Sequence, residues 1–388
     1  MYKISLYDKL ADEGFKKFDS SKYIVKEMLD DPDGILVHST PLHDEEFGPN
    51  LKSIVRIGAG VNTIPVDRLT KMGVSVFNCP GGNANAVKEL TLAAMIMVMR
   101  NGFRAMKWVQ SLPEEESAAG KTVEKGKEQF RGPEIMGKTI GVIGAGAIGG
   151  RMIKACDDLG MTVIAYDPYL SNAKVQELSQ YCTFVEDLDD LLKASDIVTI
   201  HIPFNKENKE FLDQEKIDKM KDGVFVVNYA RGQVVDNDAI VKSLESKKIA
   251  GYATDFPTPE EMQREDVVYT PHLGAGTPEA DINCSIMAAH ETIDYIENGN
   301  ISNSVNLPNV SFQRAEGSRI CIIHDNKRGM LDQMIDVVVK NDLNIENLVN
   351  KAKGDIAYTI MDFDVEVEDE VAEKIKPIDG VIRVRLLK

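Results

Sequence analysis

The sequence predicts an α/β fold: a Rossmann-type doubly wound parallel sheet in the middle of the chain, an α/β domain before it and a small domain after it. Three observations support this prediction. Short β-branched runs alternate with amphipathic stretches between about residues 138 and 272, residues 1–100 repeat the pattern more weakly, and Arg319–Lys388 arranges strands and helices in a different order. Continuous apolar runs are typical of strands buried on both faces of a parallel sheet. Their alternation with helices indicates a doubly wound domain.

The first part of the chain is expected to hold four strands and one long helix. The strands are Tyr2–Leu6, Gly34–Val37, Ser53–Ile57 and Val74–Phe77. The helix, Ala84–Asn101, is apolar almost all round, which is typical of a buried helix. The charged stretch Pro113–Lys127 is then expected to be an exposed excursion before the middle domain.

The middle domain is expected to contain six strands, with helices between them such as Ala147–Leu159 and Asp236–Ser246. The strands are Thr139–Ile143, Met161–Tyr166, Asp196–Ile200, Val224–Asn228, Ile249–Ala253 and Val267–Thr270. The polar stretch Ser302–Ser318 contains a proline and little periodicity, as is typical of a linker. A βαββαβ pattern follows it, with elements at Ile320–His324, Met330–Asn341, Ile345–Lys351, Ala357–Val367, Val371–Ile375 and Val381–Leu387.

The charge, the cysteines and the apolar runs of the sequence exclude several classes of function. The chain has 388 residues, of which 45 are basic and 62 acidic, and a formal charge of −17. Such a surface repels phosphate backbones, so we expect no nucleic-acid binding. Five scattered cysteines without a CxxC pair predict neither a disulfide framework nor a zinc site. No apolar run reaches 18 residues and the N-terminus is charged where a signal peptide is apolar, so we expect no membrane association and a reducing, cytoplasmic location.

A glycine-rich turn follows the first strand of the middle domain. Gly144 permits the tight turn, Gly146 lets the backbone approach a pyrophosphate, and Gly149 lets the next helix pack closely on the strand. The helix N-terminus then directs free N–H groups at the phosphates. Asp167 ends the following strand, 18 positions beyond Gly149. A carboxylate there accepts hydrogen bonds from the adenosine ribose and repels a 2′-phosphate, which predicts NAD rather than NADP.

Three further polar residues follow predicted strands, where an open α/β sheet places its ligand crevice. Arg231 is suited to hold a carboxylate through two parallel N–H bonds. His272, between a proline and a glycine-rich stretch, suits a general acid or base, and Glu260 suits a carboxylate that orients an imidazole. Taken singly, each has an ordinary alternative: a surface salt bridge for Arg231, a solvated loop position for Glu260 and a satisfied buried histidine for His272.

Taken together, the order GxGxxG, Asp, Ala-Arg-Gly, Glu and Pro-His-Leu-Gly-Ala resembles the D-isomer-specific 2-hydroxyacid dehydrogenase family. Two segments of the first domain, Arg56–Asn62 and Val76–Pro80, are similar to the family's substrate loops. The resemblance covers nearly the whole chain. It implies a flavodoxin-like substrate domain built from residues 1–101 and 274–302, with an NAD-binding Rossmann domain, residues 102–273, inserted between its two parts.

The resemblance also implies roles for individual residues. His272 would take the hydroxyl proton of a 2-hydroxy acid, Glu260 would orient His272, and Arg231 would bind the substrate carboxylate. Substrate contacts are implied for Arg56, Gly58, Asn62 and Lys88. Positions that match the family's NAD site are Gly144, Gly146, Ala147, Ile148, Gly149, Asp167, His201, Pro203, Ala230, Asp255 and Gly274. Asp255 matches a partner of the nicotinamide amide, and no metal is implied.

The remaining chain divides into the linker and a segment that resembles an ACT regulatory domain, residues 303–318 and 319–388. In serine-regulated members of the family, the positions that match His324, Asn326 and Asn344 contact L-serine across a domain–domain interface. This resemblance implies a homo-oligomer, either a dimer or a tetramer, with L-serine as effector. It also implies NAD-dependent oxidation of 3-phospho-D-glycerate to 3-phosphohydroxypyruvate, the first step of L-serine biosynthesis. The ordinary alternative is that His324 and Asn326 cap the helix that begins near Gly329.

Two departures from the family pattern leave alternatives open. Pro259 stands where the family usually has its glutamate after Phe-Pro-Thr, so Glu260 is the expected partner of His272 and Glu261 is a second candidate. His38 stands before Ser39 where phosphate-specific members often have arginine. An unphosphorylated 2-oxo acid such as hydroxypyruvate or glyoxylate is therefore the alternative substrate. Alternatives of another class are a non-catalytic NADH-sensing protein and an amino-acid sensor with a vestigial enzyme part.

Overall fold

The computed structural model describes residues 1–115 and 120–388, and the contacts within it divide the chain into two compact units. The first unit comprises Met1–Asn83 and Pro278–Lys388, and the second comprises Ala84–Thr277. Residues 116–119 of the predicted excursion lie outside the described residues. The contact division places the long helix in the second unit and the C-terminal sheet in the first. The finer division into substrate, cofactor, linker and regulatory domains stays a prediction.

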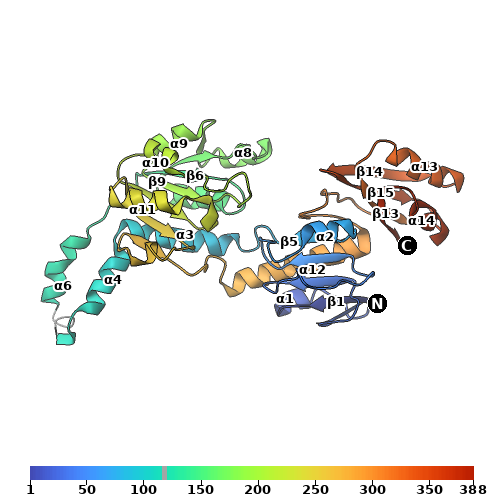
Figure 1. Ribbon diagram of the computed structural model, residues 1–388, viewed down its shortest axis with the longest axis horizontal. Helices are drawn as coiled ribbons and strands as arrows, with labels where there is room; N and C mark the ends of the chain where they lie inside the picture. Colours follow the sequence, from blue (N-terminus) through green and yellow to red (C-terminus); the bar gives the residue numbers. More distant parts are fainter. Residues whose placement is uncertain (116–119) are drawn as a thin grey trace. The chain divides into compact units, whose positions relative to one another are not determined.

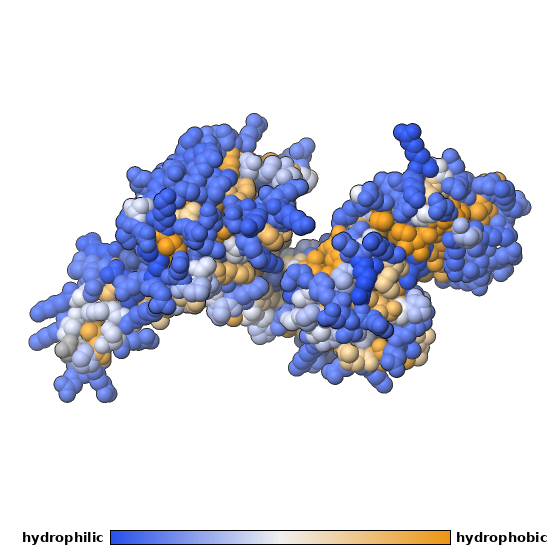
Figure 2. Space-filling model, viewed as in Figure 1, coloured by the Kyte–Doolittle hydropathy of each residue, from blue (hydrophilic) through white to orange (hydrophobic). Residues whose placement is uncertain are grey.

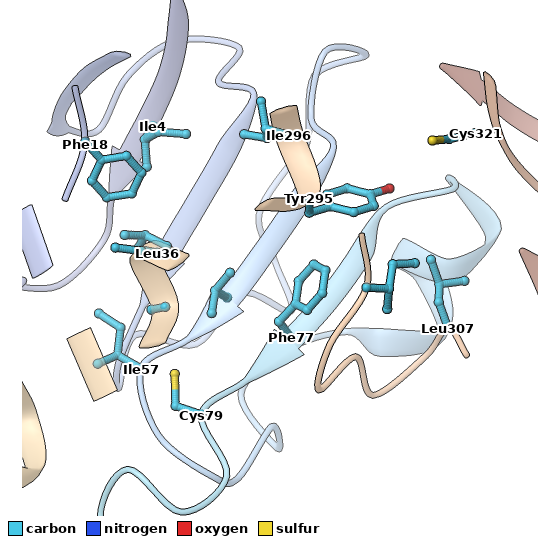
Figure 3. Packing of buried hydrophobic residues seen from close by; sticks show 14 of the residues in the cluster. Ile4, Phe18, Leu36, Ile57, Phe77, Cys79, Tyr295, Ile296, Leu307 and Cys321 are labelled. Carbon is cyan, nitrogen blue, oxygen red and sulfur yellow. The ribbon is translucent and has the colours of Figure 1, made fainter. Parts of the chain in front are cut away.

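The first unit is built on a parallel sheet with the strand order β2-β1-β3-β4-β5, which is the flavodoxin-like order. Its strands are β1 (Tyr2–Leu6), β2 (Tyr23–Glu27), β3 (Gly34–Val37), β4 (Ser53–Arg56) and β5 (Ser75–Asn78). The helices are α1 (Asp12–Phe15), α2 (Val66–Lys71) and α12 (Pro278–Asn298). Ile35 packs in the core beside α2, whereas the next residue, Leu36, packs in the core beside α12. Both faces of the sheet are therefore buried, and Figure 3 shows the α12 side, where Phe77 and Tyr295 meet.

The second unit holds a parallel sheet of seven strands in the order β12-β11-β10-β9-β6-β7-β8. The strands are β6 (Thr139–Ile143), β7 (Thr162–Tyr166), β8 (Thr183–Phe184), β9 (Ile197–Ile200), β10 (Val224–Asn228), β11 (Ile249–Thr254) and β12 (Val267–Tyr269). Val226 and Val227 point into different cores, so the continuous apolar run reflects burial on both faces. The predicted doubly wound sheet is confirmed, and its strand order reverses between β6 and β9.

Helices cover both faces of this sheet, as Figure 1 shows. The face with α3 (Ala84–Met99) and α7 (Gly149–Asp158) has one core, and the face with α9 (Leu188–Ala194), α10 (Gln214–Lys219) and α11 (Asn237–Glu245) has another. The remaining helices are α4 (Gly102–Ser111), α6 (Lys121–Gly126) and α8 (Asn172–Leu178). Short 3₁₀ turns lie at Lys127–Phe130, Gly232–Val234 and Glu261–Gln263.

The C-terminal part forms an antiparallel sheet with the order β14-β15-β13-β16 and confirms the predicted βαββαβ pattern. Its elements are β13 (Arg319–Asp325), α13 (Met330–Lys340), β14 (Ile345–Lys353), β15 (Ile356–Phe363), α14 (Asp369–Ile375) and β16 (Val381–Leu387). Ile322 faces a core shared with α13 and α14, whereas Ile323 faces the core that contains Tyr295 of α12. Figure 2 shows hydrophobic side chains gathered over the strands of this sheet.

The polar segment after α12 packs against the first unit's sheet. Asn306 is buried, its Oδ1 accepts from the Val76 amide at 2.8 Å, and its Nδ2 donates to the Val74 carbonyl at 2.9 Å. Ser304 forms an antiparallel bridge with Phe77. These contacts extend the edge of the sheet beyond β5. The segment's polar composition therefore reflects hydrogen bonding to a strand edge as well as contact with water.

One end of α12 is closed by side chains from the C-terminal part. Arg385 donates from Nη1 to the Tyr295 carbonyl at 3.0 Å and from Nη2 to the Ile296 carbonyl at 2.7 Å. Its guanidinium also lies 4.5 Å from the Tyr295 ring centroid. A helix leaves its last four carbonyl groups without partners inside the helix. In α12, Arg385 is the donor to the Ile296 carbonyl and a second donor to the Tyr295 carbonyl, which also accepts from the Gly299 amide at 2.9 Å.

Two further arginines satisfy the other two carbonyl groups. Arg314 donates to the Glu297 carbonyl at 3.3 Å, and Arg319 donates to the Asn298 carbonyl at 2.7 Å. Arg319 is fully buried, and its Nε and Nη2 donate to the two oxygens of the fully buried Asp362 at 2.6 and 2.8 Å. Positive charge also favours the carboxyl end of a helix. The C-terminal part is thus joined to α12 by polar contacts as well as by the shared core.

We predict that Arg385→Met destabilises the first unit. Methionine fills much of the volume but donates no hydrogen bond, which removes the Arg385 donor of the Ile296 carbonyl at a cost of about 1–3 kcal/mol. The Tyr295 carbonyl keeps its bond from the Gly299 amide. Calorimetry should show the transition of this unit at a lower temperature. Arg328→Met, at an exposed arginine of the same C-terminal part, should shift it little. Equal transition temperatures for the two variants would contradict the capping role.

Glu291 of α12 is a buried carboxyl group with one unsatisfied oxygen. It is 9% exposed, Oε1 accepts from Asn303 Nδ2 at 2.7 Å, and Oε2 has no partner among the described residues. Burial raises the pKa of Glu291 to about 8, because removal from water penalises the charged form. In the unfolded chain this carboxyl has its ordinary pKa near 4.5. Between pH 4.5 and about 8, Glu291 is therefore protonated in the folded state and ionised in the unfolded state.

We predict that the folding stability contributed by Glu291 falls as the pH rises from about 4.5 to 8. Between pH 5.5 and 8.5, the wild type should lose about 3 kcal/mol relative to Glu291→Gln, which keeps the acceptor for Asn303 but carries no charge. Chemical unfolding at a series of pH values measures this difference. Glu346→Gln, at an exposed position, serves as the control and should parallel the wild type. Parallel curves for Glu291→Gln and the wild type would contradict the raised pKa.

Candidate functional site

The glycine turn after β6 has the geometry of a phosphate cradle. Gly144 has a φ of +88°, and a side chain there would meet the His201 carbonyl at 3.0 Å. A Cβ on Gly149 would lie 1.8 Å from the Gly144 carbonyl oxygen, whereas a Cβ on Gly146 would meet nothing within 4 Å. Packing therefore requires glycine at positions 144 and 149, whereas the backbone of Gly146 is accessible to a ligand. These residues, with the N-terminus of α7 behind them, fit a dinucleotide pyrophosphate.

Asp167 is held beside this turn. Its Oδ2 accepts from the Ala145 amide at 2.9 Å and its Oδ1 accepts from the Tyr169 amide at 3.0 Å. Ala147 is exposed and Ile148 is half-buried at the start of α7. The structure therefore brings the predicted carboxylate to the glycine turn, where it fits the adenosine ribose of NAD.

His201 follows β9, the strand on the other side of the point where the strand order reverses. Its amide donates to the Ile143 carbonyl at 2.8 Å, and its Nε2 lies 3.0 Å from Thr199 Oγ1. Burial lowers the pKa of His201 to about 3, so the ring is neutral at physiological pH. Pro203, two residues on, is exposed. His201 can line the cofactor crevice as a polar group, but it does not carry a proton at neutral pH.

The turn after β10 positions Arg231. Asn228 Oδ1 accepts from the Ala230 amide at 3.1 Å, and Asn228 Nδ2 donates to the Arg231 carbonyl at 2.9 Å. Arg231 is half-buried, and its Nη1 donates to the Ala230 carbonyl at 2.6 Å. Burial lowers the pKa of Arg231, and the charge of Asp255 opposes this shift. The turn therefore presents a guanidinium that stays charged at neutral pH. The positioning role of Asn228 was not predicted, although an asparagine two residues before a turn amide is a readable signal.

His272 lies in the loop after β12, next to the Arg231 turn. Its ring centroid is 4.7 Å from that of Phe256, and a Cβ on Gly232 would meet Phe256 Cβ at 3.1 Å. Phe256 therefore contacts both the residue after Arg231 and the His272 ring. The structure brings two of the three predicted catalytic segments together through an aromatic ring that the sequence analysis did not identify. Asp255 and Gly274 lie in the same cluster, since the Gly274 amide donates to the Asp255 carboxylate.

The two candidate glutamates differ in environment. Glu260 is exposed, whereas Glu261 is fully buried. Glu261 Oε2 accepts from the Thr258 amide at 2.8 Å, and Thr258 Oγ1 accepts from the Glu261 amide at 3.3 Å. This reciprocal pair is a capping box at the start of a 3₁₀ turn. Burial raises the pKa of Glu261. Glu261 thus has a local structural role, and Glu260 is the carboxylate that faces solvent.

The predicted substrate residues fall in both units. Arg56 ends β4, its Nη1 donates to the Ile57 carbonyl at 3.1 Å, and the same atom would lie 1.4 Å from a Cβ on Gly58. Asn62 is exposed farther along this loop. Lys88, in α3 of the second unit, pairs with Glu89 at 3.6 Å. The Arg56 guanidinium therefore lies against Gly58, and glycine is favoured there because its φ of +141° is rarely adopted by residues with a side chain.

Within one chain, the structure does not bring the three predicted effector residues together. His324 is buried, with ring nitrogens 2.8 Å from the Asp325 carbonyl and 2.8 Å from Thr359 Oγ1. Asn326 Nδ2 donates to the Gly354 carbonyl at 3.2 Å. Asn344 precedes β14 at the other end of the sheet. Six residues of β15 separate the partners of His324 and Ile345, which corresponds to roughly 20 Å.

The described residues offer neither a metal-binding cluster nor a membrane-spanning helix. No group of three or more histidine, cysteine, aspartate or glutamate side chains suited to a metal ion was found within residues 1–115 and 120–388. Across the same ranges, no helix combines the length and apolar character needed to cross a membrane. The five cysteines are all free thiols.

Comparisons with known proteins identify the family. A model of the D-isomer specific 2-hydroxyacid dehydrogenase NAD binding domain matches residues 92–274. D-3-phosphoglycerate dehydrogenase of Haemophilus influenzae is 32% identical over 358 residues, which cover 88% of this chain and 82% of the relative. The Escherichia coli K12 enzyme of the same name is 32% identical over 385 residues, which cover 94% and 88% of the two chains.

Solved structures agree with this result. The NAD⁺-bound 3-phosphoglycerate dehydrogenase of Entamoeba histolytica matches with a TM-score of 0.63 and 25% identity, over 79% of this chain and 98% of that one. The match includes the parallel sheets described above, and the glycine turn with Asp167 fits the same cofactor. The chain therefore belongs to the D-isomer-specific 2-hydroxyacid dehydrogenase family, as an enzyme that uses NAD.

Proposed function

We propose that the chain oxidises 3-phospho-D-glycerate at C2 to 3-phosphohydroxypyruvate, the first step of L-serine biosynthesis, in the cytoplasm. The observation that carries this proposal is the meeting of the Arg231 turn and the His272 ring on Phe256. A charged guanidinium beside an imidazole suits a 2-hydroxy acid, because one binds the carboxylate and the other takes the hydroxyl proton. The named relatives that span 88% and 94% of the chain support the phosphorylated substrate.

The residues divide the reaction between them. Arg231 holds the substrate carboxylate and polarises the C2 oxygen, which fixes the C2–H bond for transfer. His272 accepts the proton of the C2 hydroxyl as the C–O bond becomes a carbonyl. Glu260 orients the imidazole and stabilises its protonated form. The glycine turn and Asp167 would hold NAD, which would supply the acceptor for the hydride from C2. The substrate thus loses one hydride and one proton in total.

The substrate carries a carboxylate and a phosphate, whereas the chain carries a formal charge of −17. Positively charged side chains near the substrate must therefore outweigh the repulsion from the negative net charge of the chain. Arg56 is anchored against Gly58, and Lys88 is a second cation that could serve this purpose. Asn62 supplies an exposed amide at the end of the same loop as Arg56. We assign the phosphate contact to the loop of Arg56 and Asn62 as part of the proposal, and Lys88, in the other unit, is a separate candidate cation.

L-serine as effector and a homo-oligomer, dimer or tetramer, belong to the same proposal. His324 and Asn326 lie at one end of the C-terminal sheet and Asn344 lies at the other. A ligand that touches all three therefore requires a second copy of this sheet. Strand β14 forms an edge of the sheet, and its exposed Leu348 is suited to contact such a copy. These observations support a serine site shared between two chains.

The test is NADH consumption with 3-phosphohydroxypyruvate, hydroxypyruvate, glyoxylate and pyruvate, each with and without L-serine. We expect a strong preference for the phosphorylated acid and inhibition by L-serine. In the same assay His272→Ala should lose about 10²–10⁴-fold in turnover while it still binds NADH. His290→Ala, at an exposed histidine of α12, is the matched control and should behave as the wild type.

Other results of this assay would favour a different substrate or a non-catalytic function. Preference for an unphosphorylated acid, with no effect of L-serine, would mean that His38 marks a different specificity. His38 Nδ1 lies 2.9 Å from Ser39 Oγ, so its ring is held within its own loop. NADH binding without turnover on any acid would favour a sensor. Near-normal turnover of His272→Ala would reject the assignment of the base.

We predict that Glu260→Gln and Glu261→Gln separate the two candidate glutamates. Glu260→Gln removes the charge that would stabilise protonated His272, so kcat should fall by about 10–100-fold with an unchanged melting temperature. Glutamine can replace glutamate in a capping box, and an uncharged side chain is tolerated at this buried position. Glu261→Gln should therefore keep kcat within a few-fold of the wild type. The opposite result would transfer the role to Glu261. Steady-state kinetics and thermal unfolding of both variants decide between them.

A further inference from the structure

The loop that carries His272 has an unfavourable backbone conformation. His272 has a φ of +54°, which lies in the left-handed region that residues with a Cβ rarely adopt. Such a conformation persists only where the surroundings determine it, and it is frequent at functional sites. Part of the structure must therefore hold the loop, because the local sequence does not favour it.

Asp255, the first residue after β11, makes the contacts that hold this loop. It is 2% exposed. Its Oδ1 accepts from the Leu273 amide at 2.7 Å and its Oδ2 accepts from the Gly274 amide at 2.7 Å. Its carbonyl oxygen accepts from the His272 amide at 2.9 Å, and Thr270 Oγ1 donates to Oδ1. Three consecutive amides and one hydroxyl are thus directed at a single residue.

We propose that Asp255 is a positioning residue, which acts through the backbone of residues 270–274 to aim the His272 imidazole at the substrate. This inference rests on the proposed function, because it concerns the residue assigned there as the base. It adds a role to the one that the family resemblance implies for Asp255, a contact with the nicotinamide amide. Both carboxylate oxygens are engaged by the loop before any ligand is considered.

The arrangement requires an acceptor at both oxygen positions. An asparagine has nearly the same shape, but one oxygen is replaced by an NH₂ group that only donates. Whichever way the amide is turned, either the Leu273 or the Gly274 amide would face a donor. Gly274 is also required, since a Cβ there would lie 3.0 Å from Asp255 Oδ2. Asp255→Asn should therefore release the loop with little change in volume.

The experiment compares Asp255→Asn with Asp236→Asn in the full-length protein. Asp236 caps α11 through the Ala239 amide at 3.1 Å, and asparagine is an equally good cap. For Asp255→Asn we expect kcat to fall by about 100-fold, as for a misplaced catalytic group. The NADH dissociation constant, measured by fluorescence titration, should rise by a much smaller factor than the factor by which kcat falls, since most contacts with the cofactor remain. Asp236→Asn should match the wild type in both measurements.

Hydrogen–deuterium exchange supplies a readout that does not depend on activity. In the wild type, the amides of residues 272–274 should be protected, and Asp255→Asn should expose them without a change in the β6–α7 region. Thr270→Val, which deletes one donor to Asp255 but keeps the carboxylate, should lower kcat by a smaller factor. Thr270→Ser keeps the hydroxyl donor and should have a kcat close to that of the wild type. This pair tests the proposal if Asp255→Asn does not fold.

Three results would overturn the proposal: an unchanged kcat in Asp255→Asn, unchanged exchange at residues 272–274, or a loss of NADH binding as large as the loss of kcat. The last result would mean that Asp255 acts only on the cofactor. Absence of turnover in the wild type is a different result, since it rejects the proposed function. The exchange measurement would then still decide whether Asp255 holds the loop.

Discussion

Asp255 is the residue on which the loops after β10, β11 and β12 of the seven-stranded sheet depend. Its backbone amide donates to the Asn228 carbonyl, and Asn228 in turn shapes the Arg231 turn. Its side chain binds the loop that carries His272. The three segments follow neighbouring parallel strands, β10, β11 and β12. Since strands lie about 4.8 Å apart, the Arg231 and His272 segments begin about 10 Å apart, and Phe256, which follows β11, contacts both of them.

Hydrogen bonds from a charged side chain to several backbone groups also occur in the first unit, where the side chains are positive. There, arginines donate to main-chain carbonyl groups at the end of α12, whereas Asp255 accepts from main-chain amides at the end of β12. In both places a buried charged side chain satisfies several backbone groups that regular secondary structure leaves unpaired. Loss of one such side chain therefore affects a whole turn of the backbone, which makes these positions more sensitive than their small contact areas suggest.

The parts of the fold that could be predicted have local signals. The glycine turn and Asp167 follow from spacing within one strand–helix–strand unit, and the long parallel strands follow from continuous apolar runs. Strand β2 was missed because Tyr23–Glu27 ends in charged residues, and β8 has only two residues. The contact of Phe256 with His272 depends on the loops that follow β11 and β12, whose conformations have no periodic signal in the sequence. Arg385 and Tyr295 are 90 positions apart, so no local pattern could reveal that contact.

The C-terminal sheet and the segments that carry Arg231, Asp255 and His272 belong to different units of the chain. That sheet shares one core and four capped carbonyl groups with α12, in the unit that contains Arg56. Arg231, Asp255 and His272 belong to the other unit, and the chain passes between the units only at Asn83–Ala84 and Thr277–Pro278. An effector bound to the C-terminal sheet therefore has no direct covalent path within its own unit to the His272 loop. Within its own unit, such a ligand can act only on residues such as Arg56, and a ligand that acted through the Asp255 contacts would need to reach the second unit itself.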